Sequence, residues 1–176
     1  VTTAEQGAVS IHGLFVGRER ALFEAAVKLS QEKNLNFLDE PLQKAVVYLD
    51  EHEFKSTWLG NKAIYRTRLA MARGGQLIIL APGVRKFGED DEIDRLIRKY
   101  GYVGRERVIS LIGRNRDLKE NLAVAAHLIH GSSDGQFDIT YAVAKLSRAE
   151  IEQVNFRYQP LEEALRQYDP ALLRDG

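Results

Sequence analysis

Three basic side chains recur at a spacing that one helix face would bring together. Arg66 and Arg73 follow Lys62 by 4 and 11 residues, and an α-helix returns these offsets to nearly the same angle. The pattern predicts a helix over residues 61–73, with Tyr65 beside a cationic stripe. Such a stripe could hold a carboxylate or a phosphate, because ammonium and guanidinium groups form charge-assisted hydrogen bonds with both. A solvated face of a surface helix is the alternative interpretation.

The predicted helix leads into a stretch where a ligand could approach the backbone. Gly74 is expected to end the helix, the apolar residues 76–81 predict a buried parallel strand, and a loop over residues 82–88 follows. Strand ends and helix starts gather unsatisfied backbone groups in α/β proteins, and a helix start also attracts anions. A plain connection with turn residues is the alternative for the loop. The candidate ligand contacts around these two points are Trp58, Asn61, Lys62, Arg66, Pro82 and Gly83.

The histidines provide a weaker pattern. His127 and His130 lie three residues apart, just before Gly131, at a predicted helix end. A metal site of this kind needs at least a third ligand, and imidazoles near a helix C-terminus have an ordinary capping role. His12 falls in a predicted strand and His52 in a polar loop, without an evident partner. We therefore expect this chain to hold no metal.

Composition excludes several classes of protein. The chain has 25 lysines and arginines and 25 aspartates and glutamates, so it carries no net positive charge that would favour binding to nucleic acid. No apolar run reaches the length of a membrane span. The absence of cysteine fits a cytoplasmic protein and removes thiolate chemistry. Neither a dinucleotide-binding or Walker fingerprint nor a serine nucleophile elbow occurs.

Strand-like and helix-like segments alternate at least five times along the chain. The predicted strands are 8–16, 45–49, 76–81, 108–111, 137–143 and 154–158. The predicted helices are 18–30, 61–73, 89–100, one opened by an Asp117/Glu120 capping box, a short one opened by Ser147/Glu150, and a last one starting at Pro160. This order implies right-handed βαβ crossovers. We predict a single Rossmann-like α/β domain over residues 1–176, with a mostly parallel sheet and helices on both faces.

The order of elements, together with several short motifs, resembles the C-terminal domain of nickel-dependent lactate racemases and related 2-hydroxyacid racemases. The resemblance covers most of the chain. The segments that carry it are Ile11–Gly17, Ala45–Leu49, Lys62–Leu80, Leu146–Glu150 and Leu161–Leu165.

The resemblance implies a two-domain protein, of which this chain is the C-terminal half. The family uses a nickel pincer nucleotide to take a hydride from the substrate α-carbon and return it to either face. The resemblance places that cofactor, its tethering lysine and the catalytic histidines in the N-terminal domain. In this half it implies a glutamine and, three residues later, a lysine. Lys62 matches the lysine, whereas Leu59 stands in place of the glutamine. This departure favours a hydroxyacid or polyol acid other than lactate.

We therefore predict a substrate-side domain of a racemase or epimerase. In it, Lys62 would act on the substrate, helped by Trp58, Asn61, Arg66 and the Pro82–Gly83 turn. The isolated domain is expected to be inactive and to bind no cofactor alone, its partners being its own N-terminal domain and a small 2-hydroxyacid. A non-catalytic α/β module that binds a nucleotide or a partner protein is the first alternative. A self-contained transferase or isomerase of small acids is the second.

Overall fold

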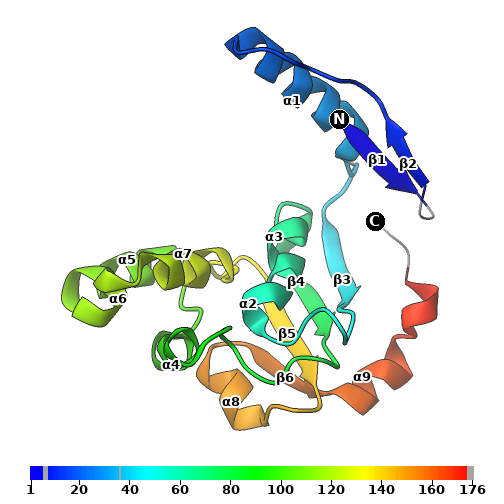
Figure 1. Cartoon of the computed structure of the whole chain (residues 1–176). Coiled ribbons are helices and arrows are strands. Elements are labelled where there is room, and N and C mark those ends of the chain that lie inside the picture. Colours follow the sequence, from blue (N-terminus) through cyan, green and yellow to red (C-terminus); the bar gives the residue numbers. More distant parts are fainter. Residues whose placement is uncertain (6–7, 36, 174–176) are drawn as a thin grey trace. The chain divides into compact units, whose positions relative to one another are not determined.

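The computed structural model describes residues 1–5, 8–35 and 37–173 (Figure 1). The chain divides into two compact units, one formed by residues 1–39 and one that begins at Glu40. Within the described part, no helix is both long and apolar enough to cross a membrane.

The first unit is a β-hairpin and a helix. Strand β1 (Thr2–Glu5) pairs antiparallel with β2 (Ala8–Ile11), and α1 (Arg20–Asn34) follows. The sequence predicts this helix correctly, but the strand expected over residues 8–16 ends at Ile11. No described residue of α1 is fully buried, and Phe23 is 69% exposed.

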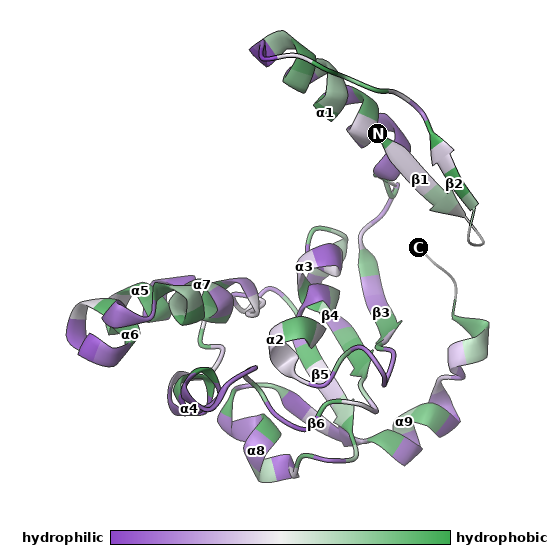
Figure 2. Cartoon of the chain, in the orientation of Figure 1, coloured by the Kyte–Doolittle hydropathy of each residue, from purple (hydrophilic) through white to green (hydrophobic). Residues whose placement is uncertain are grey.

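The second unit is built on a four-stranded parallel sheet in the order β3-β4-β5-β6. The predicted α/β class is thereby confirmed. Side chains alternate across each strand, so Leu77 and Ile79 of β4 face one core cluster while Ile78 and Leu80 face another. Burial on both faces explains the unbroken apolar run, and Figure 2 shows β4 and β5 as mostly hydrophobic. The strand bounds are Leu42–Tyr48 (β3), Met71–Leu80 (β4), Asp138–Val143 (β5) and Arg157–Pro160 (β6).

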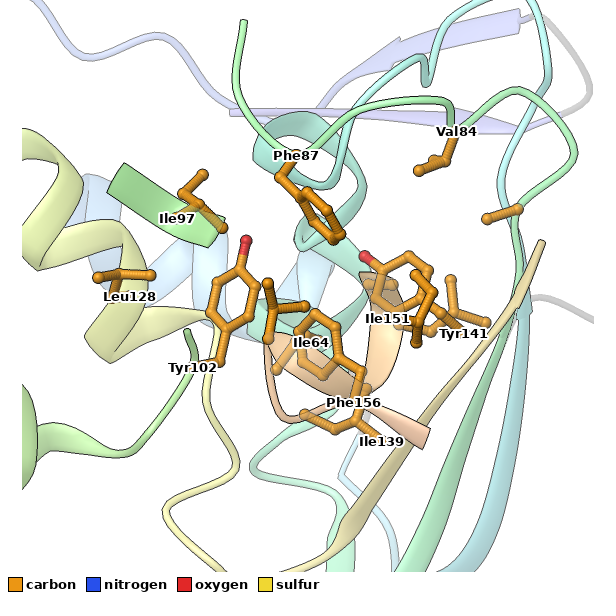
Figure 3. Packing of buried hydrophobic residues seen from close by; sticks show 14 of the residues in the cluster. Ile64, Val84, Phe87, Ile97, Tyr102, Leu128, Ile139, Tyr141, Ile151 and Phe156 are labelled. Atoms are coloured by element: carbon orange, nitrogen blue, oxygen red, sulfur yellow. The ribbon is translucent and has the colours of Figure 1, made fainter. Parts of the chain in front are cut away.

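Helices cover both faces of this sheet, as predicted. On the first face, Ile64, Ile97, Leu128 and Ile151 belong to the same core cluster as the sheet residue Tyr141 (Figure 3). These four residues come from α3, α4, α7 and α8. The helices between β3 and β6 are Thr57–Gly60 (α2), Lys62–Thr67 (α3), Asp91–Tyr100 (α4), Arg105–Arg114 (α5), Arg116–Glu120 (α6), Leu122–His130 (α7) and Arg148–Gln153 (α8). On the second face, α9 (Leu161–Gln167) buries Leu161 and Ala164, and a 3₁₀ turn over Pro170–Leu172 follows.

The helix predicted over residues 61–73 is wrong at its C-terminal end. Helix α3 stops at Thr67, and residues 71–75 belong to strand β4. Gly74 does not terminate a helix: it lies in the strand at φ +74°, and its N–H donates to the Gln136 carbonyl at 2.7 Å. The pairing of β4 with β3 is irregular here, because its register shifts between Leu42 and Lys44. Pairing with distant segments therefore overrides the local helical pattern.

Two further predictions fail in the long connection between β4 and β5. Residues 108–111 lie inside helix α5 rather than in a strand, with Val108 buried against the core. Asp117 does not cap a helix: it lies inside α6, where its carboxylate accepts hydrogen bonds from Lys99 Nζ at 2.7 Å and from the Tyr100 hydroxyl at 2.5 Å. Short apolar runs cannot distinguish a strand from a buried helix segment by periodicity alone.

Two other helix starts with side-chain caps are predicted well. Ser147 and Glu150 form the expected capping box at α8. The Asp90 carboxylate accepts a hydrogen bond from the Ile93 N–H at 2.7 Å. Asp90 is thus the N-cap of α4, which begins at the next residue, Asp91. Such caps satisfy local backbone donors and so are readable from the sequence.

Candidate functional site

Two loops meet at the carboxyl ends of β3 and β4. They cover residues 50–56 and 81–88, and they pack without room for a side chain at Gly83. A Cβ atom there would lie 2.6 Å from the carbonyl oxygens of both Glu51 and Phe54. Glycine is therefore needed at this position because the backbone of the neighbouring loop passes close to it. Pro82 beside it is partly exposed.

Lys62 lies at the same edge. It is the first residue of α3, it is exposed, and its Nζ stands 5.7 Å from the centroid of the Phe54 ring. Within the described residues, no carboxylate lies within ion-pair distance of this ammonium. Phe54 is a neighbour of both features, because its ring lies beside Lys62 and its carbonyl oxygen lies against Gly83. An ammonium over an aromatic face gains a modest electrostatic attraction.

The predicted stripe of three cations does not exist. Arg66 follows Lys62 by one turn on α3 and is exposed, but Arg73 lies on β4. Helix α3 also has only six residues, too few for the summed dipole that a longer helix places at its start.

Trp58 and Asn61 belong to a buried network under the start of α3. Asn61 is 0% exposed, and its side-chain oxygen accepts a hydrogen bond from the Tyr141 hydroxyl at 2.7 Å. Its amide nitrogen lies 3.4 Å from Nε2 of His127. Trp58 stacks on the same imidazole, with ring centroids 4.3 Å apart. This placement lets Asn61 and Trp58 hold the turn that presents Lys62.

His127 is the centre of this network, and it is 6% exposed. The Tyr65 hydroxyl lies 2.9 Å from Nδ1, and the Tyr102 hydroxyl lies 3.0 Å from Nε2. Burial lowers the pKa of His127 to about 4 and raises the pKa of Tyr65 to about 12. All these groups are therefore neutral at physiological pH.

The hydrogen bonds around Tyr102 select one tautomer of this histidine. Thr57 donates its hydroxyl proton to the Phe87 carbonyl at 3.1 Å, so the contact of 2.9 Å between Thr57 and Tyr102 requires Tyr102 to donate. Tyr102 can then only accept from His127, which places the imidazole proton on Nε2. Nδ1 accepts in turn from Tyr65. In this tautomer Nε2 and the Asn61 amide nitrogen are both donors, so their contact of 3.4 Å is not a hydrogen bond. The hydrogen bonds among Thr57, Tyr102, His127 and Tyr65 are all made without charge.

Sequence reasoning missed the role of His127, which it treated as a capping residue or one of a metal pair. A usable signal was present, because His127 stands among the apolar residues of α7 at a core-facing position. His130 is exposed instead. Among the residues described here, no three histidine or carboxylate side chains gather where they could ligate a metal.

Two hollows open at the opposite edge of the sheet, near the amino ends of β4 and β5. One has a volume of about 230 Å³ and is lined in part by Tyr102, Phe137 and Phe156. The other has a volume of about 1000 Å³ and shares Gly135 and Gln136 with the first. None of the six candidate ligand contacts lines either hollow.

Comparison with known proteins places the fold. No family model matches the chain, and no curated protein matches it. A crystal structure of a Thermotoga maritima protein, determined by a structural genomics consortium, superposes with a TM-score of 0.65 at 28% identity over 88% of this chain and 37% of that one. The lactate racemase apoprotein from Thermoanaerobacterium thermosaccharolyticum superposes with a TM-score of 0.50 at 14% identity over 76% of this chain and 32% of that one.

This chain therefore spans about a third of the length of both solved structures. At 14% identity, the likeness to lactate racemase concerns the fold alone. The chain is thus related in fold to part of lactate racemase.

Proposed function

We propose that this chain is the substrate-side domain of a lactate-racemase-like isomerase that acts on a 2-hydroxyacid. The observation that carries the proposal is the Lys62 ammonium, which is exposed at the carboxyl edge of the sheet and has no carboxylate partner among the described residues. Ligands of α/β proteins commonly bind at that edge. The fold likeness to the lactate racemase apoprotein supports the class of reaction.

In this proposal Lys62 binds and orients the substrate carboxylate. An ammonium is a compact charge with three donors, which suits a monocarboxylate. The Phe54 ring lies beside it, with its centroid 5.7 Å from Nζ, and the face of an aromatic ring helps to hold an ammonium in place. Arg66 and the Pro82–Gly83 turn form the rim of the site. The proposal assigns the nickel pincer nucleotide to the N-terminal domain of the full-length protein, as the family resemblance implies.

Asn61 and Trp58 have positioning roles in this proposal. Both precede Lys62 in the chain. Asn61 is held from below by the Tyr141 hydroxyl, and Trp58 by the stacked imidazole of His127. A fixed turn limits the conformations available to the lysine stem, so less entropy is lost when the ammonium meets its ligand. The substitution of Leu59 for the family's glutamine leaves Lys62 as the main polar contact from this turn.

The test uses the full-length protein that contains this domain. Chiral chromatography after incubation with a panel of enantiopure 2-hydroxyacids measures racemisation or epimerisation. We expect Lys62→Ala to lower turnover by about tenfold or more, as loss of a charge-assisted contact does. Lys119→Ala removes an exposed lysine of α6 and should leave turnover unchanged.

Equal turnover of Lys62→Ala and wild type would remove Lys62 from the site. Elemental analysis and intact-mass spectrometry of the full-length protein test the wider assignment, since they detect nickel and a covalent nucleotide adduct. A full-length protein that lacks both, and that converts none of the hydroxyacids, would contradict the racemase proposal. Activity of the isolated chain would support a self-contained enzyme instead.

A further inference from the structure

The larger hollow is lined by four arginines from three separate segments of the fold. Arg68 follows α3, Arg73 lies on β4, and two more arginines stand in the first turn of α5. We call this hollow the arginine groove. Its lining residues are Arg68, Arg73, Val103, Gly104, Arg105, Glu106, Arg107, Ser110, Asp134, Gly135 and Gln136.

Asp134 connects two of these segments. Its Oδ1 accepts a hydrogen bond from the Arg105 N–H at 2.6 Å, and its Oδ2 lies 3.6 Å from Arg68 Nη2. The carboxylate is therefore already engaged at the start of α5. Gly74 donates to the Gln136 carbonyl at 2.7 Å, which fixes the strand position next to Arg73 against the same loop.

The charges of the groove do not balance. Four guanidinium groups face two carboxylates, those of Glu106 and Asp134, so the lining carries a net charge of +2. Arg68 is partly buried, with 27% of its side chain exposed, whereas the other three arginines are exposed. Positive charge concentrated in a hollow raises the local concentration of anions. A dianionic or more highly charged ligand would neutralise the surplus.

We propose that the arginine groove binds a small anion with at least two phosphate groups. Guanidinium forks match phosphate oxygens in bidentate geometry, and the Ser110 hydroxyl and Gln136 amide add neutral donors. The volume of about 1000 Å³ admits a diphosphate or a nucleoside diphosphate. The lining residues that the structure describes include no aromatic ring, so recognition rests on the phosphates rather than on a stacked base.

This groove is a second site, separate from the site proposed around Lys62. It lies toward the amino ends of the strands, where Arg73 stands near the start of β4 and Gln136 precedes β5. Lys62 belongs to the carboxyl edge. The proposal therefore stands or falls independently of the racemase function.

Isothermal titration calorimetry of the chain with inorganic pyrophosphate, at physiological ionic strength, tests the proposal. We expect saturable binding that Arg107→Gln and Arg73→Gln each weaken by about tenfold, the effect of one charge-assisted contact. Arg166→Gln replaces an exposed arginine of α9 outside the groove and should leave the dissociation constant unchanged. Far-ultraviolet circular dichroism confirms that each variant is folded.

Titration with ADP separates the two sources of the phosphates. Equal affinities for ADP and pyrophosphate indicate a free diphosphate, and tighter binding of ADP indicates a nucleotide. Absence of saturable binding of both ligands to the wild type would overturn the proposal. Unchanged affinity in both groove variants would overturn it as well, as would equally strong competition by a glutamate-rich peptide, because general attraction of negative charge would then suffice.

Discussion

Trp58 stacks on the imidazole of His127, with ring centroids 4.3 Å apart and planes 28° from parallel. The two residues are far apart in sequence, and one precedes Lys62 while the other lies near the end of α7. Their stacking joins the turn that presents the candidate lysine to the interior of the domain. It also makes the state of His127 observable, because Trp58 is the only tryptophan of the chain.

The first prediction concerns the fluorescence of Trp58. Burial lowers the pKa of His127 to about 4, and an imidazolium stacked on an indole quenches its emission. We expect emission to fall with a midpoint near pH 4 as the pH is lowered. Fluorescence titration of the wild type and of His127→Gln measures this, and a transition retained in His127→Gln would assign it to another group.

The second prediction concerns stability. An unfolded histidine has a pKa of about 6.5, whereas folded His127 has a pKa of about 4. Between these values the unfolded chain binds the extra proton, so the free energy of unfolding falls as the pH falls from about 6.5 to 4 and is fully regained above 6.5. The pKa difference corresponds to about 3 kcal/mol. Urea denaturation at several pH values measures it.

His127→Gln is the control for that experiment, because glutamine cannot titrate. The variant should lose about 3 kcal/mol of the pH dependence over this window, whatever its stability at neutral pH. The same slope in wild type and variant would contradict the assignment.

The third prediction concerns Asn61. Its replacement by alanine leaves the buried Tyr141 hydroxyl without its acceptor, and an unsatisfied buried polar group costs about 1–3 kcal/mol. Chemical denaturation of Asn61→Ala should show a loss in that range. Asn34→Ala removes exposed hydrogen bonds at the end of α1 and should change the stability far less. Equal effects would show that the Asn61 network adds little.

The fourth prediction compares two glycines. A Cβ at Gly83 would lie 2.6 Å from two backbone oxygens, whereas a Cβ at Gly113 of α5 would meet nothing within 4 Å. Gly83→Ala should therefore destabilise the domain by about 1–3 kcal/mol, the usual cost of overpacking. Gly113→Ala should stabilise it by about 0.5–1 kcal/mol, because alanine favours a helix. Thermal denaturation of both variants measures this, and a Gly83→Ala variant as stable as wild type would show that the two loops can separate.

Some of the candidate site was predictable from the sequence, and some was not. Lys62 and the Pro82–Gly83 turn were selected from strand-end and helix-start patterns, and the fold places them around Phe54. Arg73 was assigned to the same helix face but lies on β4. The three basic residues do have helical spacing in the sequence, but the segment that contains Arg73 forms a strand because it pairs with β3. Whether Lys62 contacts a substrate stays a prediction.

The sequence by itself determined the features that depend on neighbouring residues: the apolar strand over 76–80, the acidic start of α4 and the capping box at α8. Only the tertiary structure decided that residues 71–75 extend a strand and that residues 108–111 are helical. The tertiary structure also brings Trp58 and Asn61 into contact with His127, which the sequence did not predict. The physical reason is that capping and periodic burial act within a few residues, whereas strand pairing and buried hydrogen bonds join residues separated by long stretches of chain.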